Sequence, residues 1–201
     1  MASVVISGNT SGSVTLSAPA VAGSSTQTLV AATGTLAPIV SGTAVASTSG
    51  TSIDFTGIPN WVKRITVMFN GVSTNATNSS RYLIQIGTGG TPTITGYLSQ
   101  ASSIGSATNT SLTSGLITTG FVLQGFLPFA TAHAFSGSIV ITNITGNTWV
   151  SSGNLSNDSA ANGVAMSAGR VSLSGVLDMV RITSVSTPDT FDAGTINIMY
   201  E

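Results

Sequence analysis

The chain has 201 residues, of which only eleven carry a charged side chain, so that 5% of the sequence is charged against roughly 25% in an ordinary globular domain. Five Lys and Arg residues and a net charge of -1 are too little basic charge for a nucleic-acid partner, and the lack of cysteine excludes disulfides and thiolate metal sites. Ser, Thr, Gly or Asn interrupts every apolar run before it reaches the roughly 18 residues of a membrane helix, so we expect no membrane insertion.

Residues 1–50 contain no charged and no aromatic side chain. Short apolar pairs alternate there with Gly, Pro and Ser, and the large side chains are too few to build a core. Thr and Val favour an extended backbone, whereas Gly and Pro interrupt it. We therefore predict that residues 1–50 form an extended arm for attachment or oligomerisation, or one chain's share of an interwoven β structure. Residues 51–201 then form a separate domain.

The pattern after residue 50 is that of β-strands. Ile65, Val67 and Phe69 occupy every second position before the turn dipeptide Asn70-Gly71. Residues 82–86 and 135–142 alternate in the same way, and no helical period of useful length occurs. The sequence thus predicts an all-β fold, an antiparallel β-sandwich resembling a jelly roll. The predicted core residues are Ile65, Val67, Phe69, Ile84, Ile139, Ile141, Ile182 and Ile198.

Residues 99–114 are almost all small and polar. Such a run carries few large apolar side chains that could anchor it to a core. We predict that it is a long loop outside the sandwich.

The sequence offers little to catalysis. Its one imidazole, His133, has no Gly-x-Ser-x-Gly elbow to accompany it, and we interpret it as structural. The run from Asp189 to Gly194 lacks the alternating oxygen ligands of a calcium loop and is interpreted as a turn. No spacing pairs the carboxylates in the manner of a glycosidase, and we assign no catalytic, cofactor or metal site. The carboxylates are those of Asp54, Asp158, Asp178, Asp189, Asp192 and Glu201.

Trp61 and Trp149 are the two largest aromatic side chains. An aromatic face can stack on a sugar ring, but in a small β domain such side chains more often fill a core or an interface. We interpret both as core or interface residues. Lys63 and Arg64 are interpreted as a charge pair that protects a sheet edge.

Three stretches resemble structural proteins of the particles of tailed bacteriophages. Residues 7–16 (SGNTSGSVTL), with the apolar pairs up to residue 36, are similar to a segment near the start of tail fibres and related proteins. Residues 54–73 (DFTGIPNWVKRITVMFNGVS) resemble the opening of a β domain in the same class, and residues 191–201 (FDAGTINIMYE) fit its close. The class carries no catalytic residues. An arm of about 50 residues leading straight into the domain also fits a short head fibre or a capsid decoration protein.

The resemblance implies a function in assembly. We expect a structural protein of the virion, assembled in the cytoplasm of the bacterial host, that forms a homo-oligomer, a trimer by resemblance, and contacts other virion proteins of the head or tail. We expect no enzymatic activity and no cofactor. The alternative is an adhesin domain of a tail fibre that binds a glycan on the host surface. Small polar loop tips favour the structural function over recognition.

Overall fold

The structure is a computed structural model, and it describes residues 3–7, 11–17, 37–75, 81–105, 111–125, 133–158, 163–185 and 189–201. The chain divides into two compact units, Met1–Leu36 and Ala37–Glu201. In the first unit, strands β1 (Ser3–Ser7) and β2 (Ser13–Ser17) form an antiparallel hairpin, with Val4 paired to Leu16 and Ile6 to Val14. The second unit holds the other strands of the described residues, and it is the part that we call the domain.

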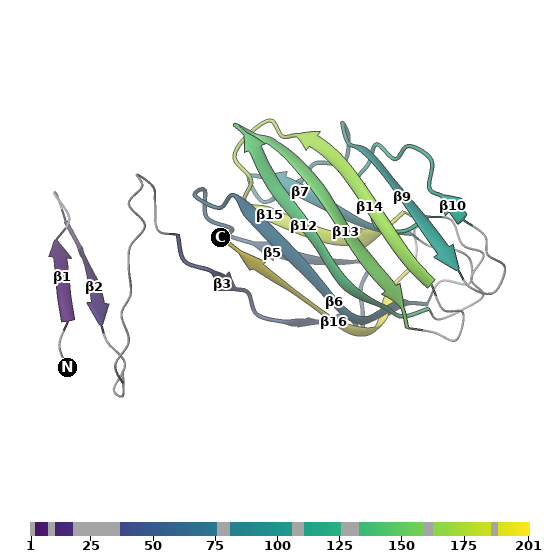
Figure 1. The fold of residues 1–201 in the computed structure, drawn as a ribbon, viewed down its shortest axis with the longest axis horizontal. Helices are drawn as coiled ribbons and strands as arrows, with labels where there is room; N and C mark the ends of the chain where they lie inside the picture. Colours follow the sequence, from purple (N-terminus) through teal and green to yellow (C-terminus); the bar gives the residue numbers. More distant parts are fainter. Residues whose placement is uncertain are drawn as a thin grey trace. The chain divides into compact units, whose positions relative to one another are not determined.

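The strands of the domain form two antiparallel sheets (Figure 1). The larger sheet has the order β10-β9-β14-β13-β12-β6-β16-β3, with β4 also paired to β16, and the smaller has the order β11-β7-β15-β5, with β8 paired to β7. The strands are β3 (Val40–Ser41), β4 (Val45–Ala46), β5 (Ser52–Thr56), β6 (Arg64–Thr74), β7 (Tyr82–Thr88), β8 (Thr91–Pro92), β9 (Leu98–Gly105), β10 (Ser111–Thr113), β11 (Phe121–Val122), β12 (Phe135–Thr145), β13 (Thr148–Asn157), β14 (Gly163–Ser172), β15 (Met179–Ser184) and β16 (Phe191–Tyr200).

The predicted all-β sandwich is confirmed. Figure 1 shows β6, β12, β13, β14 and β9 side by side in one layer, with β5, β15 and β7 in the layer behind. Apolar side chains of both sheets form one buried cluster between them. All eight predicted core residues belong to it and are at most 4% exposed, because they occupy the inward phase of strands in which every second side chain faces the other sheet.

Residues 37–50 belong to the domain, which differs from the predicted boundary at residue 50. Strand β3 pairs with the end of β16, and β4 pairs with its middle. Ser47 is fully buried, and its backbone N–H donates to the carbonyl of Gly194 at 2.9 Å. The large side chain of Ile39 is exposed, and backbone hydrogen bonds to β16 attach the segment to the sheet. Its attachment function remains a prediction.

The prediction of a long loop over residues 99–114 is wrong for its described part. Strands β9 and β10 form an antiparallel pair, with Ser102 opposite Thr113 and Ile104 opposite Ser111. Strand β9 also pairs with β14 along its full length. Ladder hydrogen bonds with two neighbours thus hold a sequence whose small polar side chains gave no strand signal.

The interpretation of Lys63 and Arg64 as guards of a sheet edge is also wrong. Strand β6 lies between β12 and β16, so Arg64 sits at a strand end inside the sheet. Its guanidinium forms an ion pair with the carboxylate of Glu201. The pair connects the start of β6 to the residue that follows β16.

Because two tyrosines are buried, we expect the free energy of unfolding of the domain to change with pH in the alkaline range. Burial raises the pKa of Tyr82 and Tyr97 well above the usual value near 10, and the carboxylates of Asp192 and Asp189 raise that of Tyr82 further, although a hydrogen bond with Thr74 opposes the shift. The Tyr97 hydroxyl donates to the Ile86 carbonyl at 3.1 Å and accepts from the Ile86 N–H at 2.8 Å.

We expect the free energy of unfolding to be insensitive to these groups below pH 10 and to fall above it. The unfolded chain then releases two protons that the folded domain retains, so the loss is about 1.4 kcal/mol per pH unit for each tyrosine. Urea denaturation at pH 8 to 11 measures it. In Tyr97→Phe the slope should halve, and a slope unchanged by that substitution would contradict the assignment.

Candidate functional site

The single histidine of the sequence, His133, lies beside an asparagine of the neighbouring strand. Its Nδ1 lies 3.2 Å from Nδ2 and 3.3 Å from Oδ1 of Asn157, at the end of β13. Histidine and asparagine here connect the segment before β12 to the neighbouring strand. The interpretation of His133 as structural stays a prediction.

The carboxylates make separate structural contacts. Asp54 forms a two-pronged pair with Arg181 across β5 and β15, at 2.7 Å from Nε and 2.6 Å from Nη2, and this hydrogen bonding raises the pKa of the guanidinium. Asp178 accepts from the Gly90 N–H at 3.1 Å with both carboxylate oxygens. Asp158, Asp192 and Glu201 contact Ser136, Ser73 and Arg64, respectively.

Asp189 and Asp192 are the two carboxylates that the structure brings near a common group, the buried Tyr82 hydroxyl, whose pKa both raise. One carboxylate oxygen of Asp189 is buried without a hydrogen-bond partner.

In the described residues, no three His, Cys, Asp or Glu side chains gather in a manner that could hold a metal ion. The same residues include no helix long and apolar enough to cross a membrane.

The two tryptophans lie in different surroundings. Trp149 is buried in the core cluster, as predicted. Trp61 is 38% exposed, and its ring centroid lies 6.0 Å from that of Tyr200, at an interplanar angle of 53°. Trp61 and Tyr200 therefore form a small aromatic surface close to the C-terminal end of the chain.

One part of the larger sheet has its polarity reversed. The inward positions of β9 and β14 are mostly small, and three of them, Ser99, Ser103 and Ser167, are buried serines. Four of the outward side chains are large and apolar: Leu98, Ile104, Val164 and Met166 are 40%, 50%, 49% and 48% exposed. An antiparallel sheet with one solvated face usually shows the opposite pattern. We call the outward surface of β9 and β14 the reversed face.

Packing beneath these strands explains the reversal. The Ser99 hydroxyl accepts from the Val122 N–H at 3.0 Å, and the Ser103 hydroxyl accepts from the Gly125 N–H at 2.9 Å. A Cβ on Gly169 would stand 2.9 Å from Cδ1 of Phe121, closer than real side chains allow. Strand β11 and the residues after it fill the inside with aromatic and backbone atoms, so that only small or hydroxyl side chains fit above them.

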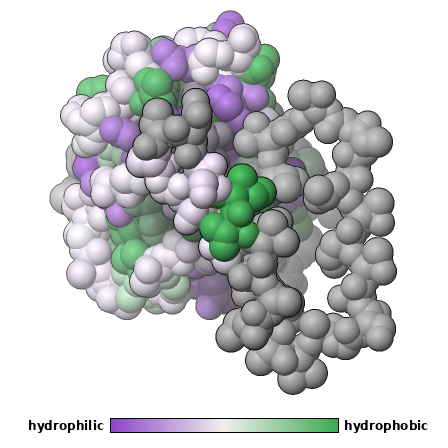
Figure 2. Space-filling view, turned by 90° about the vertical axis from the view of Figure 1, so that its left-hand side faces the viewer, coloured by the Kyte–Doolittle hydropathy of each residue, from purple (hydrophilic) through white to green (hydrophobic). Residues whose placement is uncertain are grey.

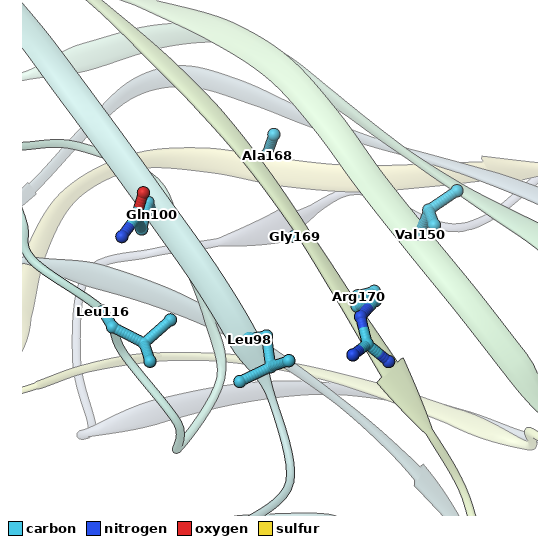
Figure 3. Close-up of a pocket in the computed structure, with 7 residues that line it drawn as sticks. All are labelled: Leu98, Gln100, Leu116, Val150, Ala168, Gly169 and Arg170. Atoms are coloured by element: carbon cyan, nitrogen blue, oxygen red, sulfur yellow. The ribbon is translucent and has the colours of Figure 1, made fainter.

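The reversed face contains a shallow groove of about 540 Å³. Figure 3 shows that Leu98 and Gln100 come from β9 and Val150 from β13, while Ala168, Gly169 and Arg170 follow β14 between them. Leu116, 55% exposed, stands beside β9. Large side chains thus flank a floor of small ones.

The outward surface of the four neighbouring strands is nearly free of charge. The register places its positions in four rows across β9, β14, β13 and β12. The rows are Leu98, Arg170, Val150 and Thr142; Gln100, Ala168, Ser152 and Val140; Ser102, Met166, Asn154 and Ser138; and Ile104, Val164, Ser156 and Ser136. Arg170 is the one charged residue among these sixteen positions, and none is aromatic. Figure 2 draws another side of the molecule, on which pale residues of intermediate hydropathy are widespread and hydrophilic residues are scattered.

Comparisons of the chain with protein-family models, with curated proteins and with solved structures found no match.

Sequence reasoning missed the reversed face. It assumes that the larger apolar residues of an alternating strand point inward, and Val164 and Met166 point outward. The sequence did contain a signal. Two runs, Leu98 to Ile104 and Val164 to Arg170, have Ser, Ala or Gly at every second position. Two adjacent strands with small residues in one phase indicate close packing on that side.

Proposed function

We propose that this chain is a structural protein of a bacteriophage particle, a short surface appendage or a decoration protein, attached through its N-terminal arm. It is assembled into the virion in the cytoplasm of the bacterial host. Its work is assembly and not catalysis, with copies of itself and with other virion proteins of the head or tail as partners. The phage assignment rests on the resemblance of residues 7–36, 54–73 and 191–201 to proteins of that class.

The reversed face carries the assembly part of the proposal. A sheet surface with half-exposed Leu, Ile, Val and Met side chains and a single guanidinium is costly to leave in water. A monomeric protein normally covers its surface with many charges of both signs, and this chain has eleven charged residues in all. Association removes the apolar side chains from water, and the Ser and Thr hydroxyls keep the remaining surface hydrated.

Immunogold electron microscopy of purified phage particles tests the proposal. Antibodies raised against residues 37–201 are expected to label intact virions at regular positions on the head or tail. A matched preparation of particles from a phage with the gene deleted serves as the control. The proposal fails if wild-type particles carry no label and mass spectrometry of their proteins finds no peptide of this chain.

The aromatic pair of Trp61 and Tyr200 favours a second candidate function, that of an adhesin domain that binds a host-surface glycan. An exposed indole next to a phenol can stack on the apolar side of a sugar ring. The test is a glycan-binding screen on the parent chain and on Trp61→Ala, with the buried Trp149 left unchanged. Binding that the substitution abolishes would support the adhesin, and no binding by the parent would reject it.

A further inference from the structure

We propose that the reversed face is the contact between copies of this chain, the same face of a second copy being its occupant. The inference rests on the proposed assembly and adds the surface through which it occurs. The two copies meet across a twofold axis, with the side chains of one copy over the groove of the other.

The size of the surface fits such a contact. Four strands about 4.8 Å apart and eight residues long cover roughly 500 Å² in plan. Relief from side chains such as Leu98, Leu116 and Met166 increases the accessible area beyond that value. One partner contributes about 800 Å² to a standard interface, so the face with its rim reaches the scale of a stable contact.

The shape of the surface is complementary to itself. Leu98 stands beside a floor formed by Ala168 and Gly169, and Leu116 lines the groove from the other side of β9, as Figure 3 shows. Protruding side chains and a hollow thus lie side by side on one face. When a second copy packs against it with the same face, the protruding side chains of each copy fill the hollow of the other. Sheet faces packed in this way lie about 10 Å apart, as they do inside a sandwich.

The chemistry of the surface selects against other partners. None of its sixteen positions is a carboxylate, and the Asp158 carboxylate beside its end row is hydrogen-bonded to the Ser136 hydroxyl, so the cations of a basic partner would lose their water for little counter-charge. The surface has no aromatic side chain on which a sugar ring could stack. A second copy of this chain presents the same uncharged hydroxyl, amide and aliphatic groups. Arg170 lies at the end of the groove, so its guanidinium stays in contact with water at the rim of the interface.

The first arm of the test adds a charge to the face. Met166→Glu in the full chain is expected to weaken association at least about a hundredfold by sedimentation velocity, because a carboxylate would be buried without a partner. Ile144→Glu is the matched control, since Ile144 is also a largely exposed aliphatic residue but lies beyond the sixteen positions. It should associate like the parent, and circular dichroism should show strands in both variants.

The second arm keeps the proposal testable if Met166→Glu does not fold. The chain has no cysteine, so Met166→Cys gives one reactive thiol per copy. A bismaleimide with a spacer of about 10 Å should join two copies at this position, and should not do so in Ile144→Cys. If the parent assembles but Met166→Glu leaves assembly unchanged and Met166→Cys gives no cross-link, the contact lies elsewhere while the proposed function stands. If the parent itself is monomeric, the assembly proposal and this inference both fail.

Discussion

Removal of residues 1–50 is expected to destabilise the domain by roughly 3–6 kcal/mol, whereas removal of residues 1–36 should leave its stability unchanged. The longer deletion takes away β3 and β4 and the hydrogen bonds by which the segment attaches to β16. Among these are Gly42 N to Ile198 O at 2.8 Å, Ser47 Oγ to Ala193 O at 2.7 Å and Phe191 N to Gly50 O at 2.9 Å. Each such bond contributes about 0.5–1.5 kcal/mol, and Val45 also packs against the core.

Urea denaturation of the two truncated proteins and of the full chain measures the difference. The deletion of residues 1–36 is the control, because it cuts at the boundary of the compact unit. Equal stability of the two truncated proteins would show that residues 37–50 do not belong to the folded domain.

Gly194→Ala is expected to cost about 3 kcal/mol or more, far beyond the usual effect of adding one methyl group. Gly194 lies where the pairing of β16 with β6 shifts register, with φ at 94°. A Cβ there would stand 2.4 Å from the Gly71 carbonyl oxygen and 2.6 Å from the Val72 Cα. These are backbone atoms of the central strand β6, which cannot move aside without breaking the sheet.

Gly146→Ala is the matched control. Gly146 also has a positive φ, 51°, but an added Cβ would meet no atom within 4 Å. Its substitution should cost only the conformational strain, about 1 kcal/mol. Thermal unfolding followed by circular dichroism compares the two, and equal losses of stability would contradict the role given to close packing at Gly194.

The core of the sandwich could be predicted because its strands keep a simple alternation. Ile65, Val67 and Phe69 on β6, and Ile139 and Ile141 on β12, are apolar at every second position, and burial follows from that phase. The same reasoning failed for β9 and β14. There Ser99 and Ser103 bond to the backbone of residues 122–125, a contact between segments far apart in the sequence.

The boundary of the domain was unpredictable for a related reason. Residues 37–50 join the sheet mainly through backbone hydrogen bonds, and a backbone pairing leaves no mark on composition. The groove of the candidate site depends on the register that brings Leu98, Arg170 and Val150 into one row. Register between strands that are distant in the chain comes from tertiary packing, which local patterns do not encode.

The central claim is that copies of this chain associate with one another. The mass of the protein in solution tests that claim most directly. We predict by light scattering at micromolar concentration a single population of about 40 kDa, the mass of the two 20.0 kDa chains that a contact between identical faces joins. A stable, monodisperse particle of 20 kDa would contradict the claim and would leave the exposed aliphatic face of β9 and β14 without an explanation.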